Sequence, residues 1–188
     1  MGLLDFLPWR RKTIDLSPAY VSVVKQARRP ELYSDKHAPD SFDGRFDMLG
    51  AHVHLVLRRF RQDGVARDEI GQALFDMFFA DMDQAMREAG VGDLGVGKRI
   101  RKMAQAFYGR AAAYDTAMGK AAPADQACLA PLAEVLARNL DPEGVRGQAG
   151  ASEGIQQLAT RLLQVEAHLA AKSVDDILAG NGFDGFDA

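Results

Sequence analysis

ALFDMFFADMDQAMREAGVGDLGVGKRIRKMAQAFYGRAAAYDTAM, residues 73–118, is the stretch of the chain that decides its fold. Apolar residues recur at every third or fourth position on both sides of a glycine-rich segment, which is the periodicity of an amphipathic α-helix. Gly90 suits the left-handed residue just past a helix end, and Asp93 suits the cap of the next helix. The stretch therefore predicts two antiparallel helices, over about 67–89 and 96–118, joined by a short connection.

The same glycines imitate two nucleotide-binding patterns. Gly92 to Lys98 reads G-x-x-x-x-G-K, and Gly90 to Gly95 reads G-x-G-x-x-G. Both motifs require a strand before the first glycine, and the phosphate-binding loop also requires Ser or Thr after the lysine. Here an amphipathic helix precedes the glycines and Arg99 follows the lysine. We therefore interpret the segment as a helix connection and expect no nucleotide site.

The remainder of the chain also has helical periodicity, and strand signals are nearly absent. The sequence predicts an all-α fold, a single-domain helical bundle of about six helices. The further helices are expected over about 17–28, 41–62, from Pro123 to 140, and 153–172. We divide the chain into an N-terminal arm of basic and apolar residues (1–16), a helical domain (17–180) and a flexible tail (181–188) that repeats Gly-Phe-Asp.

The helix predicted over 41–62 is apolar on two sides, which indicates a central position in the bundle. Its expected cap is Asp40 or Ser41. One face carries Phe42, Phe46, Leu49, Val53, Leu57 and Phe60, the other Met48, Ala51 and Leu55, and the polar arc between them Asp43, Asp47, His54, Arg58 and Arg61. His52 is thus expected to be buried and His54 to be on the surface. Because the two rings point about 200° apart on a helix, they cannot grip one metal ion.

Composition excludes several classes of protein. The net charge of −3 gives no overall attraction to nucleic acid, and no binding to DNA is expected. The single cysteine, Cys128, excludes an internal disulfide and a zinc site built on cysteines. The sequence has no Glu-x-x-His pair for a di-iron site and no recognisable nucleophile with its base. We expect neither enzyme activity nor a metal or other cofactor.

The first residues combine apolar side chains with cations: Leu3, Leu4, Trp9, Arg10 and Arg11 are the expected membrane contacts. Such a segment can rest at a bilayer interface with its tryptophan at headgroup level. The alternative is a terminus that docks on its own domain. No run of residues is long and apolar enough to span a bilayer.

The predicted helix over 96–118 is the most basic element. Lys98, Arg101 and Lys102 lie opposite its apolar stripe, where they form a solvated face or contact RNA or a membrane. Arg99 and Arg110 flank the stripe on one side. We favour pairing with a neighbouring helix, with Asp81 or Asp83 as the counter-charge, over lining a groove for a partner.

Two blocks of sequence together resemble the ubiquinol–cytochrome c chaperone family. The first is HAPDSFDGRFDMLGAHVHLVLRRFR, residues 37–61, and the second is the stretch quoted at the start. The resemblance covers about residues 36–120. Its specific part is an ordered set: an apolar helix with Asp81 and Asp83, the glycine linker 90–97, Lys98, and FYGR at 107–110.

The resemblance implies a function. Members of the family assemble the cytochrome bc1 complex, and the mitochondrial ones bind newly made cytochrome b. They are helical proteins without known catalytic chemistry, and some work with a small partner subunit near the ribosome exit. This chain looks like a bacterial member, since it lacks a long presequence, which fits synthesis in the cytoplasm.

From the resemblance we expect a non-enzymatic assembly chaperone that is cytoplasmic and peripheral on the inner membrane face. Cytochrome b is the expected client, with a ribosome contact in addition. The expected partner-binding residues are Arg99, Tyr108 and Arg110 at the border of an apolar groove, and Lys98, Arg101 and Lys102 on the basic face. The alternatives are a helical module that binds the ribosome or RNA, and a haem-handling protein that uses His52.

Overall fold

The computed structural model describes residues 15–33, 37–62, 68–120, 123–140 and 151–186, and in these ranges it confirms the all-α fold. The chain forms seven α-helices there and no β-strand. Their bounds are α1 Ser17–Ala27, α2 Phe42–Gln62, α3 Asp68–Glu88, α4 Asp93–Met118, α5 Leu129–Leu140, α6 Glu153–Ala170 and α7 Val174–Leu178. Two short 3₁₀ turns, Pro30–Leu32 and Gln126–Cys128, precede α2 and α5. No described helix has the length and apolar character needed to cross a bilayer.

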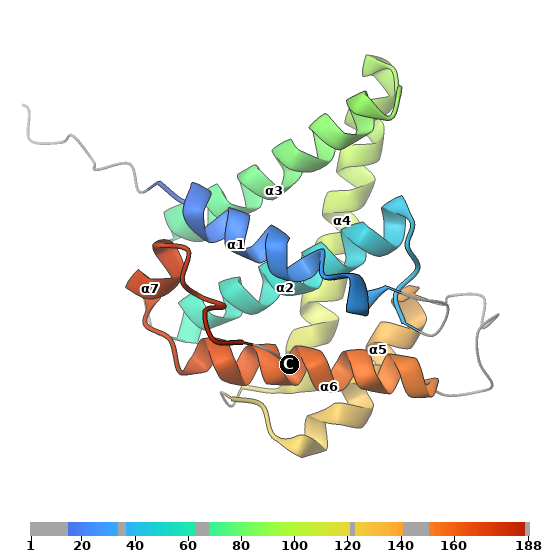
Figure 1. The fold of residues 1–188 in the computed structure, drawn as a ribbon. Helices are drawn as coiled ribbons and strands as arrows, with labels where there is room; N and C mark the ends of the chain where they lie inside the picture. The colour runs from blue at the N-terminus through green and yellow to red at the C-terminus, as the bar shows by residue number, and fades with distance from the viewer. Residues whose placement is uncertain (1–14, 34–36, 63–67, 121–122, 141–150, 187–188) are drawn as a thin grey trace, which may run out of the picture.

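Helix α2 occupies the centre of the bundle, as its two apolar sides predict. It packs against α1, α3, α4, α5 and α6 (Figure 1). At Gly50 an added Cβ would lie 3.5 Å from the Phe107 ring and 3.8 Å from the Phe78 ring, which are ordinary van der Waals distances, so both rings pack beside this position of α2. These two phenylalanines, on α4 and α3, are themselves buried.

The cap of α2 is Ser41, one of the two expected residues. Its Oγ accepts a hydrogen bond from the backbone N–H of Gly44 at 3.1 Å. Asp40 instead pairs with Arg45 at 2.6 Å. The turn is so tight that a Cβ at Gly44 would lie 2.1 Å from the carbonyl oxygen of Pro39. The entry into α2 thus depends on a glycine at this position.

The middle of the polar arc of α2 is buried, which corrects the expectation that His54 lies on the surface, whereas Asp43 and Arg61 at the two ends of the arc are exposed. Asp47, His54 and Arg58 are buried, and His54 is only 1% exposed. Phe42, placed on an apolar face, is by contrast 41% exposed in the first turn. Periodicity alone assigns polar residues to solvent, whereas here α4 and α6 cover the arc and supply its charge partners.

Helices α3 and α4 form the predicted antiparallel hairpin. Gly90 has φ +82° and ends α3 as expected, and the N–H of Val91 donates to the carbonyl of Met86 at 3.0 Å. The connection is shorter than predicted, because α4 begins at Asp93 with Gly92 as its cap residue. Asp93 therefore lies in the first turn and pairs with Arg87 across the hairpin.

The end of this hairpin projects from the remainder of the bundle (Figure 1). We call residues 83–102, the last turns of α3 and the first turns of α4, the arm, and the helices around α2 the body. Met86 and Val96 are buried within the arm, but they do not join the main hydrophobic core, which reaches Met82 on α3. The arm therefore has a small interior of its own.

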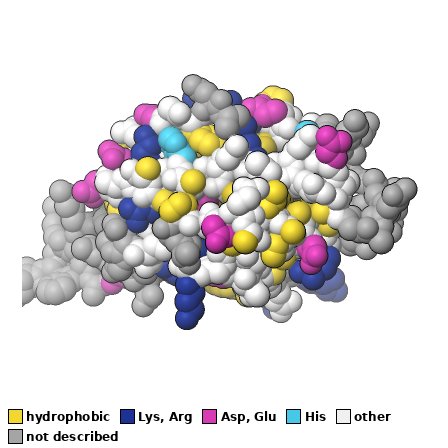
Figure 2. Space-filling view, turned by 90° about the horizontal axis from the view of Figure 1, so that it is seen from below, with side chains coloured by type: hydrophobic (Ala, Val, Ile, Leu, Met, Phe, Trp, Pro, Cys, Tyr) yellow, Lys and Arg dark blue, Asp and Glu magenta, His cyan; other side chains and the backbone are white. Residues whose placement is uncertain are grey.

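The C-terminal elements close the body. Helix α5 begins at Leu129, later than predicted, because the 3₁₀ turn follows Pro123, and α6 begins at its cap Ser152. Seen from below, hydrophobic side chains gather across the middle of the face, with charged ones scattered among them (Figure 2). A shallow groove of about 450 Å³ lies on α5, lined mainly by Ala127, Leu129, Ala130 and Ala133.

The tail predicted to be flexible from residue 181 packs on the body up to residue 186. Phe186 is buried, and the Arg161 guanidinium lies over its ring, 5.1 Å from the centroid. Nη1 of Arg29 donates to the Phe186 carbonyl at 3.1 Å. The Gly-Phe-Asp repeat suggested a solvated terminus, but its second phenylalanine finds an apolar site between α1 and α6.

Candidate functional site

An open groove lies between α2, α3 and α4 and has a volume of about 280 Å³. We call it the α2–α3–α4 groove. Its lining is mainly apolar and aromatic: Leu57, Phe60, Gly71, Phe75, Phe107, Tyr108 and Ala111, with His54, Arg61 and Gln72 as polar members. Concave apolar surfaces with a few polar groups are where proteins receive ligands or partner segments.

Tyr108 is the most exposed aromatic side chain of the groove, at 59%. Its ring stacks on Phe75 with centroids 5.2 Å apart, and Phe75 in turn contacts Phe79 and Phe107. Successive ring contacts thus connect the exposed Tyr108 to the buried aromatic side chains of the core. A rigid exposed aromatic supported in this way offers contact area at a low cost in side-chain entropy, as in the hot spots of protein interfaces.

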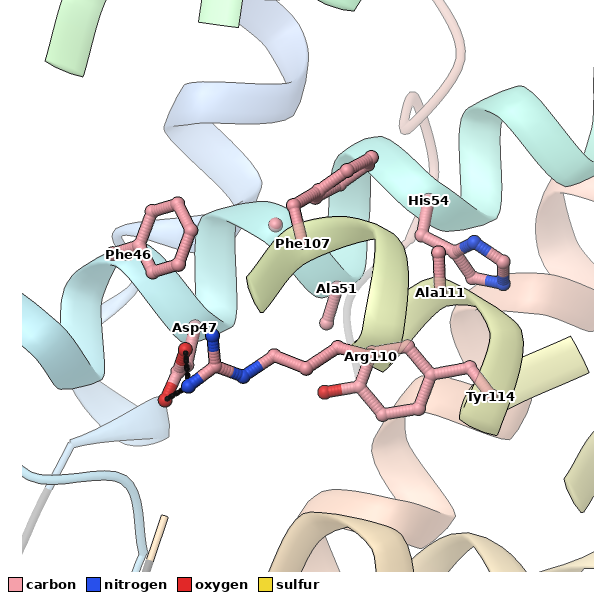
Figure 3. Close-up of a pocket in the computed structure, with 9 residues that line it drawn as sticks. Phe46, Asp47, Ala51, His54, Phe107, Arg110, Ala111 and Tyr114 are labelled. Atoms are coloured by element: carbon pink, nitrogen blue, oxygen red, sulfur yellow. Dashed lines mark hydrogen bonds and ion pairs between the residues drawn. The ribbon is translucent and has the colours of Figure 1, made fainter. Parts of the chain in front are cut away.

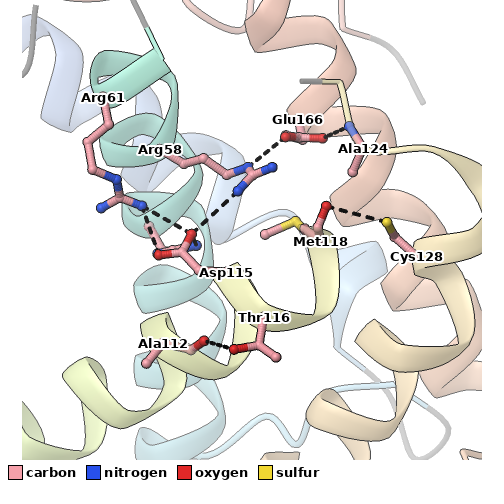
Figure 4. A network of polar contacts seen from close by, with 10 residues as sticks. Arg58, Arg61, Ala112, Asp115, Thr116, Met118, Ala124, Cys128 and Glu166 are labelled. Atoms are coloured by element: carbon pink, nitrogen blue, oxygen red, sulfur yellow. Dashed lines mark hydrogen bonds and ion pairs between the residues drawn. The ribbon is translucent and has the colours of Figure 1, made fainter. Parts of the chain in front are cut away.

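A network of charges lies beside the groove, where α2, α4 and α6 meet (Figure 4). Nε of Arg58 donates to Oε1 of Glu166 at 2.7 Å, and both side chains are buried. The second oxygen of Glu166 accepts from the backbone N–H of Ala124 at 2.6 Å. The carboxylate thereby joins α6 both to α2 and to the segment that follows α4.

Asp115 on α4 completes this network. Its Oδ1 lies 3.2 Å from Nε2 of His54 and 3.5 Å from Nη1 of Arg58, and Arg61 approaches to 3.2 Å. Burial would raise the pKa of Asp115, but the contacts with His54, Arg61 and Arg58 outweigh it and lower the pKa. Asp115 therefore stays ionised and holds the polar arc of α2 against α4.

A second ion pair joins α2 to α4 farther along, around a small cavity (Figure 3). Nη2 of Arg110 lies 3.0 Å from Oδ1 of Asp47, and its guanidinium lies over the ring of Phe46. Tyr114 and His54 line the same cavity, whose volume of about 10 Å³ is close to the space of one water molecule. Burial raises the pKa of Asp47 to about 7, against the opposing charge of Arg110.

The residues predicted to bind a partner separate into three places. Tyr108 lines the groove, and Lys98, Arg99, Arg101 and Lys102 are exposed on the arm. Arg110 lies instead in the ion pair with Asp47, where its side chain is 24% exposed. Leu3, Leu4, Trp9, Arg10 and Arg11, predicted to contact a membrane, lie outside the described residues.

The expected counter-charges were wrong. Asp81 accepts a hydrogen bond from the Tyr20 hydroxyl at 2.8 Å and lies 3.6 Å from Arg28. Asp83 pairs with Arg87 one turn along the same helix. Asp81 thus faces α1 and Asp83 pairs along α3, and none of the ion pairs within the described residues joins either carboxylate to Arg99 or Arg110. The residue that pairs with Arg110, Asp47, was placed in the polar arc but not recognised as its partner.

His52 is fully buried, as predicted, and its Nδ1 donates to the carbonyl of Met48 at 2.8 Å. Desolvation lowers the pKa of His52 to about 4, so the ring is neutral at physiological pH. It presents no exposed surface to a haem or other ligand. Among the described residues no three His, Cys, Asp or Glu side chains are grouped so that they could hold a metal ion.

Comparison with known proteins agrees with the all-α fold. The model of the ubiquinol-cytochrome C chaperone family matches residues 35–183. The chain belongs to this family. The crystal structure of the Cbp3 homolog from Brucella abortus has a similar fold, with a TM-score of 0.70. The two sequences are 33% identical, and the match covers 87% of this chain and 84% of the Brucella chain.

Curated relatives of this chaperone-family chain include ubiquinol-cytochrome c reductase complex assembly factor 1 of Mus musculus and Homo sapiens, each 26% identical over 114 residues. The protein of the same name in Xenopus laevis is 24% identical over 114 residues. These matches cover 61% of this chain, but only 38% of the mouse and human proteins and 56% of the frog protein. The chain thus spans between about a third and a half of the relatives' lengths.

Proposed function

We propose that this protein is a non-enzymatic assembly chaperone for ubiquinol–cytochrome c reductase, the cytochrome bc1 complex, and that its client is newly made cytochrome b. The family match over residues 35–183 carries the proposal. The relatives named as assembly factors for the same complex support it. The apolar groove is consistent with a protein that holds a segment of a membrane protein before it is inserted or packed.

The client-binding surface in this proposal is the α2–α3–α4 groove. An apolar client segment would cover Phe75 and Tyr108, whose rings are already positioned by their stacking. Arg99 lies nearer the start of α4 than Tyr108 and would contact the same client. Arg110 would act indirectly, because its ion pair with Asp47 fixes α4 against α2. Burial of aromatic surface supplies most of the affinity in such interfaces.

The proposed location is cytoplasmic, at the inner face of the membrane. The N-terminal residues Leu3, Leu4, Trp9, Arg10 and Arg11 would hold the protein at the interface, because each cation near anionic lipid adds about 1 kcal/mol. A ribosome contact would place the chaperone where cytochrome b emerges. Neither contact is required for the groove to bind its client.

Site-directed photocrosslinking tests the client and the surface together. A photoreactive phenylalanine analogue replaces Tyr108, and a matched variant carries it at Val21, which is 64% exposed on α1. We expect cytochrome b to be captured from native membranes by the first variant and not by the second. Equal capture at both positions would reject the groove. Normal levels of the bc1 complex in cells without the gene would reject the function itself.

A further inference from the structure

The exposed cations of α4 lie along one face of the arm. Successive residues of an α-helix are about 100° apart, so Lys98, Arg101 and Lys102 fall within one sector of the helix, with Arg99 beside it. All four side chains are exposed, and Arg101 adds a hydrogen bond to the carbonyl of Gly97. We call Lys98, Arg101 and Lys102 the α4 basic face. It is opposite to the buried Val96 and Phe107.

The carboxylates of the arm do not neutralise this face. Asp83 and Asp93 both pair with Arg87, and Asp93 lies about 140° around the helix from Lys98. Glu88 accepts from Gln84 on α3. None of the ion pairs within the described residues includes a cation of the basic face. Asp83 and Asp93 are thus engaged with Arg87, while the basic face is exposed and has no carboxylate partner among the described residues, although the whole chain has a net charge of −3.

A protein client is a poor match for this surface. Membrane proteins carry an excess of Lys and Arg in their cytoplasmic loops, so a basic face repels the client segments that lie nearest the membrane. Phosphate-bearing lipid headgroups have the complementary charge, and several clustered cations are what peripheral proteins use to bind them. The charge pattern thus favours the lipid surface over the membrane protein embedded in it.

RNA has the same charge as anionic lipid but also offers exposed bases. Proteins that bind single strands add aromatic side chains on which the bases stack. Residues 83–102 contain no Phe, Tyr, Trp or His, and Tyr108, the nearest exposed aromatic on this side of α4, is already stacked on Phe75 in the groove. Anionic lipid headgroups bind clustered cations without any stacking partner, so the composition of the arm favours a bilayer surface over RNA.

We propose that the α4 basic face, Lys98, Arg101 and Lys102, docks the projecting arm on an anionic lipid bilayer. This goes beyond the proposed function, because it assigns a second membrane contact and an orientation. Tyr108 lies seven residues after Arg101, about 10 Å along the axis and nearly in line with it. Docking through the arm therefore brings the rim of the α2–α3–α4 groove close to the headgroups, where a client segment leaves the bilayer.

Vesicle co-sedimentation with the full chain tests the proposal and needs no client, so its failure leaves the assembly function untouched. Vesicles contain phosphatidylcholine alone or with about 30 mol % phosphatidylglycerol. The test variant is Lys98→Glu, Arg101→Glu, Lys102→Glu. The matched control is Lys25→Glu, Lys120→Glu, Arg138→Glu, which changes the net charge equally at exposed positions outside the arm. Circular dichroism verifies that both variants are folded.

We expect wild type to bind the anionic vesicles and not the neutral ones, with an affinity that falls as salt is added. The test variant loses about a hundredfold in affinity, since each cation contributes about fivefold, and the control loses less than about threefold. Single neutralisations, Lys98→Gln or Lys102→Gln, lower the affinity about fivefold and provide the measurement if the triple variant does not fold.

Three outcomes would overturn the proposal. Equal losses in the test variant and its control would show a response to net charge only. Unchanged binding of the test variant would assign the membrane contact to the N-terminal residues alone. Loss of binding to a single-stranded RNA oligonucleotide, with vesicle binding retained, would make the basic face a nucleic-acid surface.

Discussion

The body and the arm of this molecule handle charge in opposite ways. In the body, Arg58, Glu166 and Asp115 are brought together between three helices, so charged groups become part of the interior. In the arm, the cations of α4 point outward and only a small apolar interior holds the two helices together. The difference teaches that two adjoining parts of one fold can place charge differently, the first between its helices and the second on its surface, where the proposed lipid contact requires it.

The buried network should give the largest effect on stability. Glu166→Gln leaves Arg58 buried without its closest carboxylate, and we expect the free energy of unfolding to fall by roughly 3–5 kcal/mol. Urea denaturation measures the change. Glu134→Gln, at an exposed position on α5, is the control and should shift stability by less than about 0.5 kcal/mol. Similar losses in both variants would mean that the network does not organise the body.

The Asp47–Arg110 pair at the joint between α2 and α4 predicts an unusual pH dependence. The pKa of Asp47 is raised to about 7, above its value of 3.8 in the unfolded chain. Between these values the folded protein holds a proton that the unfolded chain has released, so this group favours folding at low pH and loses that contribution as pH rises toward 7.

Asp47→Asn removes this titration. From pH 5 to pH 8 the contribution of Asp47 to the unfolding free energy of wild type should fall, and the variant has no such loss. The difference in unfolding free energy, variant minus wild type, should therefore rise by roughly 2–4 kcal/mol between the two pH values. Denaturation curves at the two pH values measure the gain. Asp175→Asn, at an exposed site in α7, should follow wild type at both. Equal destabilisation of the variant at both pH values would contradict the prediction, because it would show that Arg110 keeps the carboxylate of Asp47 ionised throughout this range.

The contact between α1 and the base of the hairpin should have a smaller effect. Tyr20→Phe deletes the hydroxyl that donates to Asp81, and we expect a loss of about 1 kcal/mol. Tyr108→Phe removes a hydroxyl from an exposed ring and should leave the unfolding free energy unchanged. Thermal denaturation compares the two variants. If Tyr20→Phe also leaves the stability unchanged, water replaces the hydroxyl as the donor to Asp81, and this hydrogen bond does not hold α1 to α3.

A substitution in the arm should have the smallest effect on the global unfolding free energy, even at the buried Met86. Met86→Ala opens the interior of the arm, and we expect faster amide hydrogen exchange in residues 83–102 with little change in global stability. Met118→Ala, equally buried in the main core, should lower the unfolding free energy by roughly 2–5 kcal/mol. Global destabilisation by both variants would show that arm and body unfold as one unit.

Local signals in the sequence predicted the hairpin well. The glycine at the end of α3 and the apolar periodicity on both sides depend on neighbours within a few residues, so the end of α3 and the reversal of the chain follow from them, although α4 begins at Asp93 and not near residue 96. The central position of α2 also follows, because two apolar sides require partners on both. These features place Tyr108 on a helix beside a groove, as expected.

The polar partners could not be predicted in the same way. The positions of His54 and Arg58 in the helical pattern predict a solvated surface. Their burial becomes favourable because Asp115 and Glu166, on helices distant in the sequence, pair with them. Asp47 was similarly separated from Arg110 by 63 positions. Single-sequence periodicity contains no information on such pairs. The prediction of a flexible tail was wrong up to residue 186 for the same reason, because residues of other elements form the site in which Phe186 is buried.

The contact between Arg29 and Phe186 also has a consequence for how the chain folds during synthesis. The two residues are 157 positions apart, and α1 packs against α7 just before this contact. Helix α1 leaves the ribosome early, yet one of its sides has no neighbour until α7 and the segment to Phe186 have been translated. The hairpin, whose contacts are local, can form long before. The arm can therefore form early, whereas the contact of Arg29 with Phe186 can form only after the C-terminal segment has been translated.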